Sequence, residues 1–188
     1  MCIRDSPDAL GREWQLGTVQ LDFFASSKFG LNYINQDGEK EDVVLIHRAI
    51  FGSLERFFGI LIEHFGGSFP LWLAPEQYTV IPISEDHFED CKIIEKSLSL
   101  MGLRGKVDLS SDRFNNKIRK AQKMKIPLMI IIGNNEVENS TLTIRLRNGE
   151  NLNDVKIKTL EKISKTILKI NDDEGIKLAF IGSEGQNE

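Results

Sequence analysis

VVLIHRAIFGSLERFFGILIEHF, residues 43–65, predicts a strand, a tight turn and an amphipathic helix in direct succession. A strand over 43–50 alternates its side chains between two faces. Gly52 and Ser53 predict the turn, and Ser53 is placed to cap the helix that follows. Gly66 and Gly67 end that helix. Its apolar residues recur at helical spacing and are expected to form one buried stripe: Leu54, Phe57, Phe58, Leu61, Ile62 and Phe65.

Two polar residues, His47 and Arg56, do not fit simple packing of this strand and helix. His47 lies on an otherwise apolar strand face, and Arg56 lies beside the positive end of the helix, where anions are favoured. Together they suggest a site for a metal or an anion. A lone histidine in a strand is more often a hydrogen-bonded structural residue, and zinc needs three or four ligands. An arginine on a helix mostly faces solvent, so the residues alone leave both interpretations open.

The composition is that of an ordinary globular protein and excludes several other classes. Of 188 residues, 40% are hydrophobic and 28% are charged. No apolar run reaches the length of a membrane span, and the start lacks the apolar core of a secretion signal. Cys2 and Cys91 give neither a disulfide framework nor a CxxC metal motif, so we expect a reduced, cytoplasmic setting.

Charge is sorted along the chain, although the net charge is only −4. Residues 84–103 contain five acidic and two basic side chains, whereas residues 104–125 contain eight basic and two acidic ones. The net charge argues against a protein that is basic overall. The second segment nevertheless predicts a local basic surface, although a basic helix face is often merely solvated.

Three motifs carry a resemblance to a known family. HRAIFGSLERF (47–57) resembles motif 3 of class II aminoacyl-tRNA synthetases, in the form seen in the threonyl-tRNA synthetase family. GREWQLGTVQLDF (11–23) and FPLWLAPEQ (69–77) occur in that family's order, and the resemblance spans roughly residues 8–170. It implies a threonine–tRNA ligase that uses ATP with magnesium to attach threonine to its tRNA, and a homodimer when full-length.

The resemblance also implies the fold class and the domains. Residues 8–74 are expected to form the C-terminal edge of the antiparallel-sheet catalytic domain of class II. Residues 75–171 are expected to form an α/β anticodon-binding domain, with a mixed sheet flanked by helices. Residues 1–7 match nothing in the family and are interpreted as a foreign or arbitrary start. We therefore expect a C-terminal fragment that is inactive alone, and a tail, 172–188, that is partly disordered.

Residue patterns supply the elements of these domains. A hairpin is expected over 31–46, with Asp37-Gly38 in its connection. In the second domain strands and helices alternate, and the loop GNNEVE (133–138) follows its most apolar strand. The expected elements are strand 78–83, helix 86–101, strand 104–109, helix 113–125, strand 128–133, strand 142–147 and helix 154–170.

The resemblance assigns roles around the strand at 18–22, whose polar face would otherwise be interpreted as solvent-facing. It implies that Gln15 contacts ATP and that Gln20 lies in the amino-acid pocket with His47 and Ala49. Arg56 is implied to bind ATP phosphate and to offset charge as threonine attacks the α-phosphate, which makes it the predicted catalytic residue.

The resemblance further implies that His47 is one of three protein ligands of a zinc ion in the full-length enzyme. The other two ligands, a cysteine and a histidine, belong to a region before residue 8. Zinc with an open position would bind the amino group and the hydroxyl of threonine and would reject valine. A single imidazole does not hold zinc with useful affinity, so the chain is expected to be metal-free as isolated.

The predicted anticodon surface combines a basic helix with the strand after it. In helix 113–125, Phe114, Ile118 and Ala121 are expected to form the buried stripe. The resemblance places Arg119, Glu136 and Arg145 at positions that contact anticodon bases. Lysines of the helix, Lys117 and Lys120 among them, would hold phosphates. Arg145 and Arg147 are both expected to point outward from strand 142–147.

Two other interpretations remain open at this stage. The chain could be a stand-alone tRNA-binding or regulatory module without catalysis, because an anticodon domain has a core of its own. Retention of Gln15, Gln20, His47 and Arg56 argues against that. A different synthetase of the class is the third possibility, and His47 together with the strand GREWQLGTVQLDF favours the threonine enzyme instead.

Overall fold

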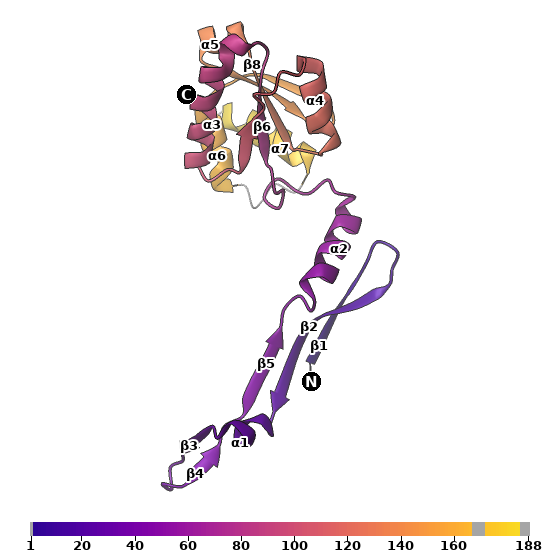
Figure 1. Ribbon diagram of the computed structural model, residues 1–188, viewed down its shortest axis with the longest axis vertical. Coiled ribbons are helices and arrows are strands. Elements are labelled where there is room, and N and C mark those ends of the chain that lie inside the picture. The colour runs from indigo at the N-terminus through magenta and orange to yellow at the C-terminus, as the bar shows by residue number, and fades with distance from the viewer. Residues whose placement is uncertain (1, 167–171, 185–188) are drawn as a thin grey trace. The chain divides into compact units, whose positions relative to one another are not determined.

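The computed structural model describes residues 2–166 and 172–184 (Figure 1). The chain divides into two compact units, residues 1–67 and residues 68–188. No helix within the described ranges is long and apolar enough to cross a membrane.

Unit 1 contains a three-stranded antiparallel sheet in the order β1-β2-β5. Its strands are β1 (Cys2–Pro7), β2 (Glu13–Asp22) and β5 (Leu45–Ala49). The short helix α1 (Ala25–Phe29) follows β2. The predicted hairpin is confirmed as β3 (Asn32–Ile34) and β4 (Lys40–Asp42), joined through Asp37-Gly38 with Gly38 at a φ of 78°. The segment interpreted as an arbitrary start therefore contributes a paired edge strand.

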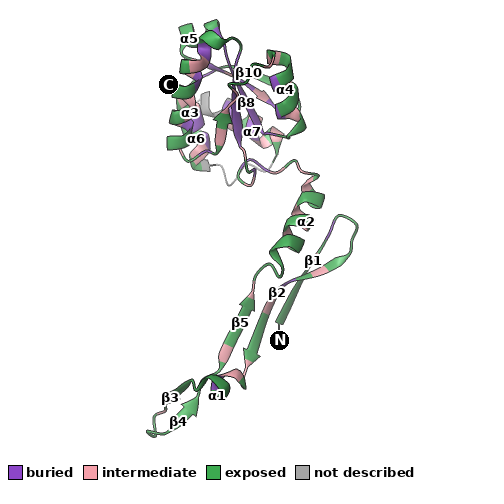
Figure 2. Ribbon diagram, in the orientation of Figure 1, coloured by how far each residue is buried: buried purple, intermediate pink, exposed green. Residues whose placement is uncertain are grey.

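Helix α2 (Leu54–Phe65) begins and ends where the sequence predicts. The Arg56 amide donates to Ser53 Oγ over 3.4 Å, and Gly66 closes the helix at a φ of 54°. The predicted burial of its apolar stripe, however, is wrong. Leu54 is 57% exposed and Phe58 is 58% exposed. Helical periodicity shows which face prefers an apolar neighbour, and the described strands of unit 1 leave this face uncovered (Figure 2).

Unit 2 is built on a five-stranded mixed sheet in the order β10-β9-β8-β6-β7, which confirms the predicted fold class. The edge strand β7 and the inner strands β6 and β8 run parallel to one another. β9 pairs antiparallel with β8, and β10 pairs antiparallel with β9. The strands are β6 (Tyr78–Pro82), β7 (Gly105–Val107), β8 (Leu128–Ile132), β9 (Leu142–Leu146) and β10 (Asn151–Val155).

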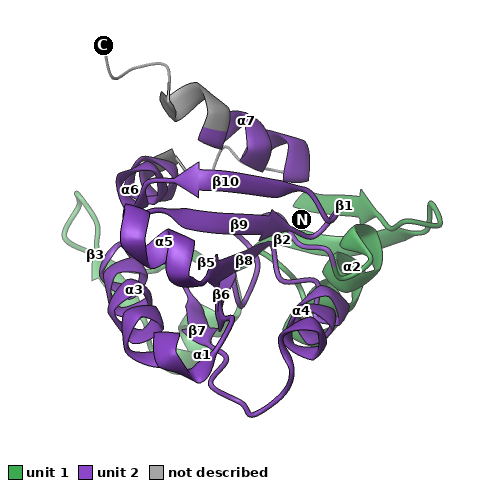
Figure 3. Ribbon diagram, turned by 90° about the horizontal axis from the view of Figure 1, so that it is seen from above, with its two compact units in different colours: residues 1–67 green, residues 68–188 purple. Residues whose placement is uncertain are grey.

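Helices cover the two faces of this sheet unequally (Figure 3). One face packs against α3, α6 and α7 through a large buried cluster that includes Leu98, Leu160 and Ile176. The other face packs against α4 through a small cluster with Ala121 at its centre. The helices are the 3-10 turn η1 (Glu85–His87), α3 (Phe88–Leu100), α4 (Phe114–Lys123), α5 (Asn134–Asn139), α6 (Ile157–Thr166) and α7 (Asp173–Glu184).

Two short elements were missed by the sequence prediction. The GNNEVE loop is the helix α5, and residues 151–155, partly assigned to a helix over 154–170, form β10. The sequence does contain a signal for β10 that the prediction overlooked: Asn148-Gly149 is typical of a hairpin turn, and Gly149 has a φ of 94°. The helix starts only at Ile157, and the end predicted for it, 167–170, lies outside the described residues.

The tail that was expected to be partly disordered contains α7, and its last residues, 185–188, lie outside the described residues. Ile176 and Phe180, four residues apart on one helix face, are 0% and 3% exposed in the large buried cluster. Asp173 at the start of α7 pairs with Arg147, the residue that directly follows β9, at 2.6 Å. Arg147 also donates to the Phe69 carbonyl, so this arginine holds the start of α7 and the start of unit 2 to the sheet. The prediction that Arg147 points into solvent is therefore wrong.

We predict that α7 is part of the stable core of unit 2. Phe180→Ala should lower the free energy of unfolding by about 3–5 kcal/mol, because it leaves a cavity beside Ile176. Leu178 of the same helix is 61% exposed, so Leu178→Ala should change the free energy of unfolding by less than about 0.5 kcal/mol. Urea unfolding followed by circular dichroism measures both, and equal effects would contradict a packed α7.

Candidate functional sites

The predicted amino-acid pocket residues of unit 1 lie side by side on β2 and β5. In the antiparallel register Gln20 lies opposite His47, and Thr18 lies opposite Ala49. Directly opposed residues share a face of the sheet, so these four side chains form one patch. The sequence predicted one polar strand face and a lone histidine on an otherwise apolar face of a second strand, and the register places that histidine beside the polar face.

His47 has one acidic neighbour rather than a set of metal ligands. Its Nε2 lies 3.2 Å from Asp22 Oδ2, and its side chain is 56% exposed. The Asp22 carboxylate accepts from the Ala25 and Phe24 amides, which lower its pKa together with His47. Within 2–166 and 172–184, no group of three or more His, Cys, Asp or Glu residues is placed to hold a metal. These residues therefore do not fit a zinc site on their own.

A second cluster of unit 1, centred on Asp8, was missed by the sequence prediction. The Asp8 side chain has no exposed surface and accepts from Trp14 Nε1 at 2.8 Å and from Arg12 Nε at 2.6 Å. The Leu10 and Arg12 amides complete its shell. The Trp14 hydrogen bond is the largest of the causes that hold the pKa of Asp8 well below its usual value. The sequence contains one signal for this cluster, an aspartate three residues before the GREW motif. Until its hydrogen-bond partners are known, such an aspartate cannot be told from an ordinary loop residue.

Trp14 connects this cluster to the predicted catalytic arginine. The Arg56 guanidinium carbon lies 5.2 Å from the Trp14 ring centroid, and that of Arg12 lies 5.8 Å from it. Among the described residues, the Arg56 guanidinium has no hydrogen bond or ion pair, and the residue is exposed. Its N–H donors are thus available to an anion beside the start of α2. Gln15, the predicted ATP contact, directly follows Trp14 on β2 and is also exposed.

In unit 2, helix α4 shows the predicted stripe, but one lysine differs from the prediction. Phe114, Ile118 and Ala121 pack in the small cluster beneath α4, as predicted. Lys117 was expected on the exposed basic face, yet it is only 4% exposed. Its Nζ donates to the Asp108 carbonyl at 3.0 Å and lies 5.6 Å from the Phe88 ring centroid. A long side chain can cross the end of the sheet, so Lys117 is structural and is not open to phosphate.

Lys120 and Arg119 lie on different flanks of α4. Lys120 lines a hollow with Lys106 and Met124 on the β7 side of the helix, and its Nζ pairs with Asp112. This pair raises the pKa of Lys120 and lowers that of Asp112. Arg119 precedes Lys120 by one residue and is exposed, so the 100° step of the helix turns it away from β7. The predicted anticodon set therefore divides into two groups.

Glu136 has a defined role inside the fold. Its Oε2 accepts from the Gly133 amide at 3.0 Å, which caps α5, and its Oε1 accepts from Thr143 Oγ1 at 2.7 Å. Thr143 lies opposite Ile131 on the sheet face that α4 covers only in part. The carboxylate is thus held at the edge of that face, with further lone pairs available to a donor.

Arg145 lies on the same sheet face, two residues after Thr143. Its Nη1 donates to Asn151 Oδ1 at 3.0 Å across the β9–β10 pair, and it lies opposite the buried Met129. Its Nε is buried and has no hydrogen-bond partner among the described residues. A buried donor without an acceptor costs free energy, so this arginine favours a ligand that supplies one.

Comparisons with known proteins agree with this division into two units. Residues 77–167 match the model of the family described as anticodon binding domain, and residues 6–65 match that of the tRNA synthetase class II core domain (G, H, P, S and T). The chain belongs to the class II aminoacyl-tRNA synthetases.

Within that class, the chain is similar to threonine–tRNA ligases. It is 49% identical to the ligase of Thermotoga neapolitana over 82% of its own length and 25% of the relative. It is 48% identical to that of Synechococcus elongatus over 82% of its length and 26% of the relative. The RNA binding domain of threonyl-tRNA synthetase from Cryptosporidium parvum superimposes with a TM-score of 0.75 at 36% identity, covering 87% of this chain and 42% of that one. The chain thus spans about a quarter of the length of these curated relatives.

We predict a pH-dependent contribution of Asp8 to the stability of unit 1. Its folded-state pKa lies below the value of 3.8 expected for an unfolded chain, so its contribution is present above that value and is lost as the pH falls. Asp8→Asn should therefore destabilise unit 1 at pH 7 and should matter less at pH 3. Thermal unfolding followed by tryptophan fluorescence over this range measures the difference. Asp37→Asn in the exposed β3–β4 turn is the control, and a pH-independent loss for Asp8→Asn would contradict the prediction.

Proposed function

We propose that this chain is part of a threonine–tRNA ligase, in which unit 2 reads the anticodon and unit 1 contributes the motif 3 edge of the active site. The identity of about half of the aligned residues to threonine–tRNA ligases supports the assignment. The observation that carries it is the hydrogen bond of Glu136 to Thr143, which shares a face of β9 with Arg145. Together with Arg119, whose place beside them is part of the proposal, Glu136, Thr143 and Arg145 are called the RNA surface.

The RNA surface supplies both kinds of hydrogen-bonding group that base reading needs. Arg145 offers the N–H groups of a guanidinium that Asn151 holds in place, and Glu136 offers acceptor oxygens whose position is fixed by Gly133 and Thr143. A carboxylate is a poor phosphate contact but accepts from the amino groups of bases. Because these groups are held before RNA arrives, little side-chain ordering remains to be done on binding.

Phosphate contacts are assigned to the exposed cations of α4. Arg113, Lys120 and Lys123 are exposed on this helix, and Lys120 can exchange Asp112 for a phosphate at little cost because surface ion pairs are weak. Such contacts position the RNA without reading it and make binding dependent on salt.

In unit 1, Arg56 is proposed to meet the phosphates of magnesium-bound ATP. The indole of Trp14 steadies its guanidinium, and the nearby helix start favours the same negative charge. Gln15 is proposed to contact ATP, and the patch of Gln20, His47 and Ala49 to face threonine. The described residues of unit 1 do not fit zinc on their own. The homodimer and the cytoplasmic location of the whole enzyme stay predictions.

A stand-alone tRNA-binding module is the second candidate. It is favoured by one observation: unit 2 has a large buried core of its own, from Leu71 to Phe180. The genomic sequence upstream of the Met1 codon separates the two candidates. An open frame that continues into a class II core with further ATP-binding residues supports the ligase, and a stop codon with a promoter supports the module.

We predict that Glu136→Gln reduces discrimination between anticodons. The glutamine can still cap α5, but it replaces one acceptor oxygen with a donor, so binding of threonine tRNA should weaken by about 1–3 kcal/mol relative to other tRNAs. Glu138→Gln, exposed on the same short helix, is the matched control. Filter binding to a set of anticodon stem-loops measures the effect. The same loss for every anticodon would exclude a base-reading role.

We predict the opposite pattern for a phosphate contact. Lys123→Ala should weaken all stem-loops alike and reduce the slope of log K against log salt by about one. Lys158→Ala, on α6 and therefore on the other side of the sheet, should leave both quantities unchanged. A change in anticodon preference for Lys123→Ala would contradict the assignment of α4 to phosphates.

We predict that a polypeptide of these 188 residues binds tRNA without forming threonyl-adenylate. It spans about a quarter of the ligases it resembles, and a phosphate-binding Arg56 alone does not complete an ATP site. Threonine-dependent ATP–pyrophosphate exchange measures adenylate formation, with the Thermotoga neapolitana ligase as the positive control. Exchange above background would refute the prediction.

A further inference from the structure

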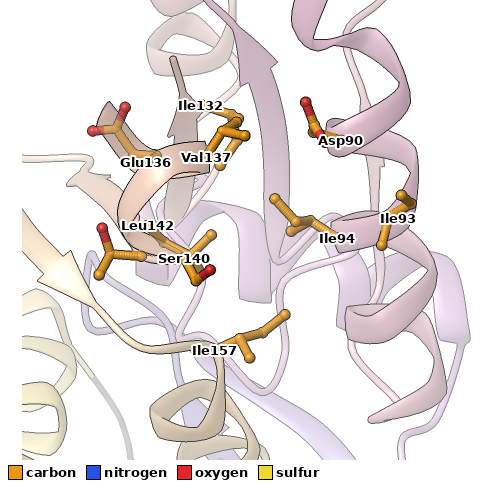
Figure 4. Close-up of a pocket in the computed structure, with 10 residues that line it drawn as sticks. Asp90, Ile93, Ile94, Ile132, Glu136, Val137, Ser140, Leu142 and Ile157 are labelled. Carbon is orange, nitrogen blue, oxygen red and sulfur yellow. The ribbon is translucent and has the colours of Figure 1, made fainter. Parts of the chain in front are cut away.

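A hollow of about 220 Å³ lies in unit 2 between α3, α5 and the start of α6 (Figure 4). Figure 4 shows Asp90, Ile93 and Ile94 of α3 on one side, and Val137 of α5 and Leu142 of β9 on the other, with Ile157 of α6 below them. The proposed reading of tRNA uses none of these six residues.

Most of the hollow lies on the opposite side of the sheet from Thr143 and Arg145, but Glu136 of the RNA surface also lines it. Leu142 belongs to the large buried cluster beneath α3 and α6, whereas Thr143 and Arg145 lie on the side of α4. Side chains alternate along a strand, so consecutive residues of β9 serve different surfaces. Glu136 is the residue that the hollow and the RNA surface share, whereas Asp90 and the apolar lining of the hollow have no part in the proposed reading of tRNA.

Acidic groups surround the hollow, and one of them lacks a partner. The Asp90 carboxylate lines it, is partly buried, and has no hydrogen bond or ion pair within the described parts of the chain. Glu136, by contrast, is occupied by Gly133 and Thr143. The residues nearby in sequence on η1, α3 and α5 add more negative charge: Glu85, Asp86, Glu89 and Glu138. Lys156 and Lys158 flank Ile157 at the start of α6, so the negative charge that attracts cations belongs to the α3 and α5 walls of the hollow.

Apolar groups remain exposed at the same place. Ile93 is 65% exposed and Val137 is 41% exposed, one on each side of the hollow. Exposed apolar groups rimmed by charge are typical of protein interaction sites. The volume is below the roughly 300 Å³ at which pockets for drug-sized ligands begin, and it suits a single side chain.

We propose that this hollow is a docking site for a protein partner that inserts one arginine flanked by aliphatic residues. The guanidinium meets the Asp90 carboxylate, and its methylene stem lies against Ile94 and Val137. The neighbouring aliphatic residues of the partner cover Ile93. Arginine fits better than lysine, because its guanidinium is more weakly hydrated and binds a carboxylate with two parallel hydrogen bonds.

The first experiment uses N-butylguanidinium as the arginine side chain and N-butylurea as its neutral isostere. The full chain is labelled with ¹³C at isoleucine δ1 methyl groups, and NMR shifts are followed during titration. The guanidinium should shift Ile93, Ile94 and Ile157 saturably, and the urea should bind about tenfold more weakly, as loss of a charge-assisted hydrogen bond predicts. Equal binding of the two, or shifts confined to isoleucines that do not line the hollow, would overturn the proposal; Ile132 also lines it.

A matched pair of variants tests the carboxylate. Asp90→Asn should weaken guanidinium binding about tenfold. Glu89→Gln removes the same charge from the adjacent position, where the side chain is 80% exposed and pairs with Lys92, and it should have little effect. Equal losses for the two variants would show that the guanidinium responds only to the overall negative charge of this surface, and that result would overturn the proposal.

A final titration separates a protein partner from a free small cation. The blocked tripeptide acetyl-Ile-Arg-Ile-methylamide should bind about tenfold more tightly than N-butylguanidinium, because its isoleucines bury Ile93 and Val137. Acetyl-Ser-Arg-Ser-methylamide, which lacks the two isoleucines, should bind no more tightly than N-butylguanidinium. If neither peptide binds more tightly than the guanidinium, the hollow holds a free cation, and the docking of a protein segment is refuted.

Discussion

The antiparallel pairing of β9 with β8 is the constraint on which the rest of unit 2 depends. It sets Ile144 opposite Ile130 in the large buried cluster and Arg145 opposite Met129 on the other side. A shift by one residue would bury Arg145 beneath α3 and expose the isoleucine. The same register places Thr143 beside Glu136, so the pairing that builds the core also builds the RNA surface.

Unit 1 depends in a similar way on one buried carboxylate. Asp8 fixes Trp14 through the indole nitrogen and Arg12 through its guanidinium, and Trp14 in turn lies beneath Arg56. A flexible arginine loses rotamer freedom when it grips a phosphate, and contact with a fixed ring removes part of that freedom in advance. The proposed catalytic group is therefore oriented by residues about 45 positions earlier in the chain, through contacts that no local pattern reveals.

The sequence predicted the elements whose signals are local. The Ser53 cap, the Gly66 end of α2, the hairpin at Asp37-Gly38 and the alternation of β9 all depend on neighbouring residues. Predictions failed where a distant residue decides. Arg147 forms an ion pair with Asp173 of α7. Lys117 contacts the Phe88 ring and the Asp108 carbonyl. The apolar stripe of α2 is not covered by the described strands of unit 1.

The sorting of charge along the sequence becomes a sorting in space because of how parallel strands are connected. The chain leaves β6 through acidic α3 to β7 on one side, then returns through basic α4 to β8 on the other side of β6. Right-handed crossovers in opposite directions place their helices on opposite faces of the sheet. Acidic α3 and basic α4 are thereby kept apart by the whole thickness of the sheet. A polyanion is then attracted to the α4 side, whereas Asp90 and the other carboxylates of α3 favour a cationic partner on the opposite side.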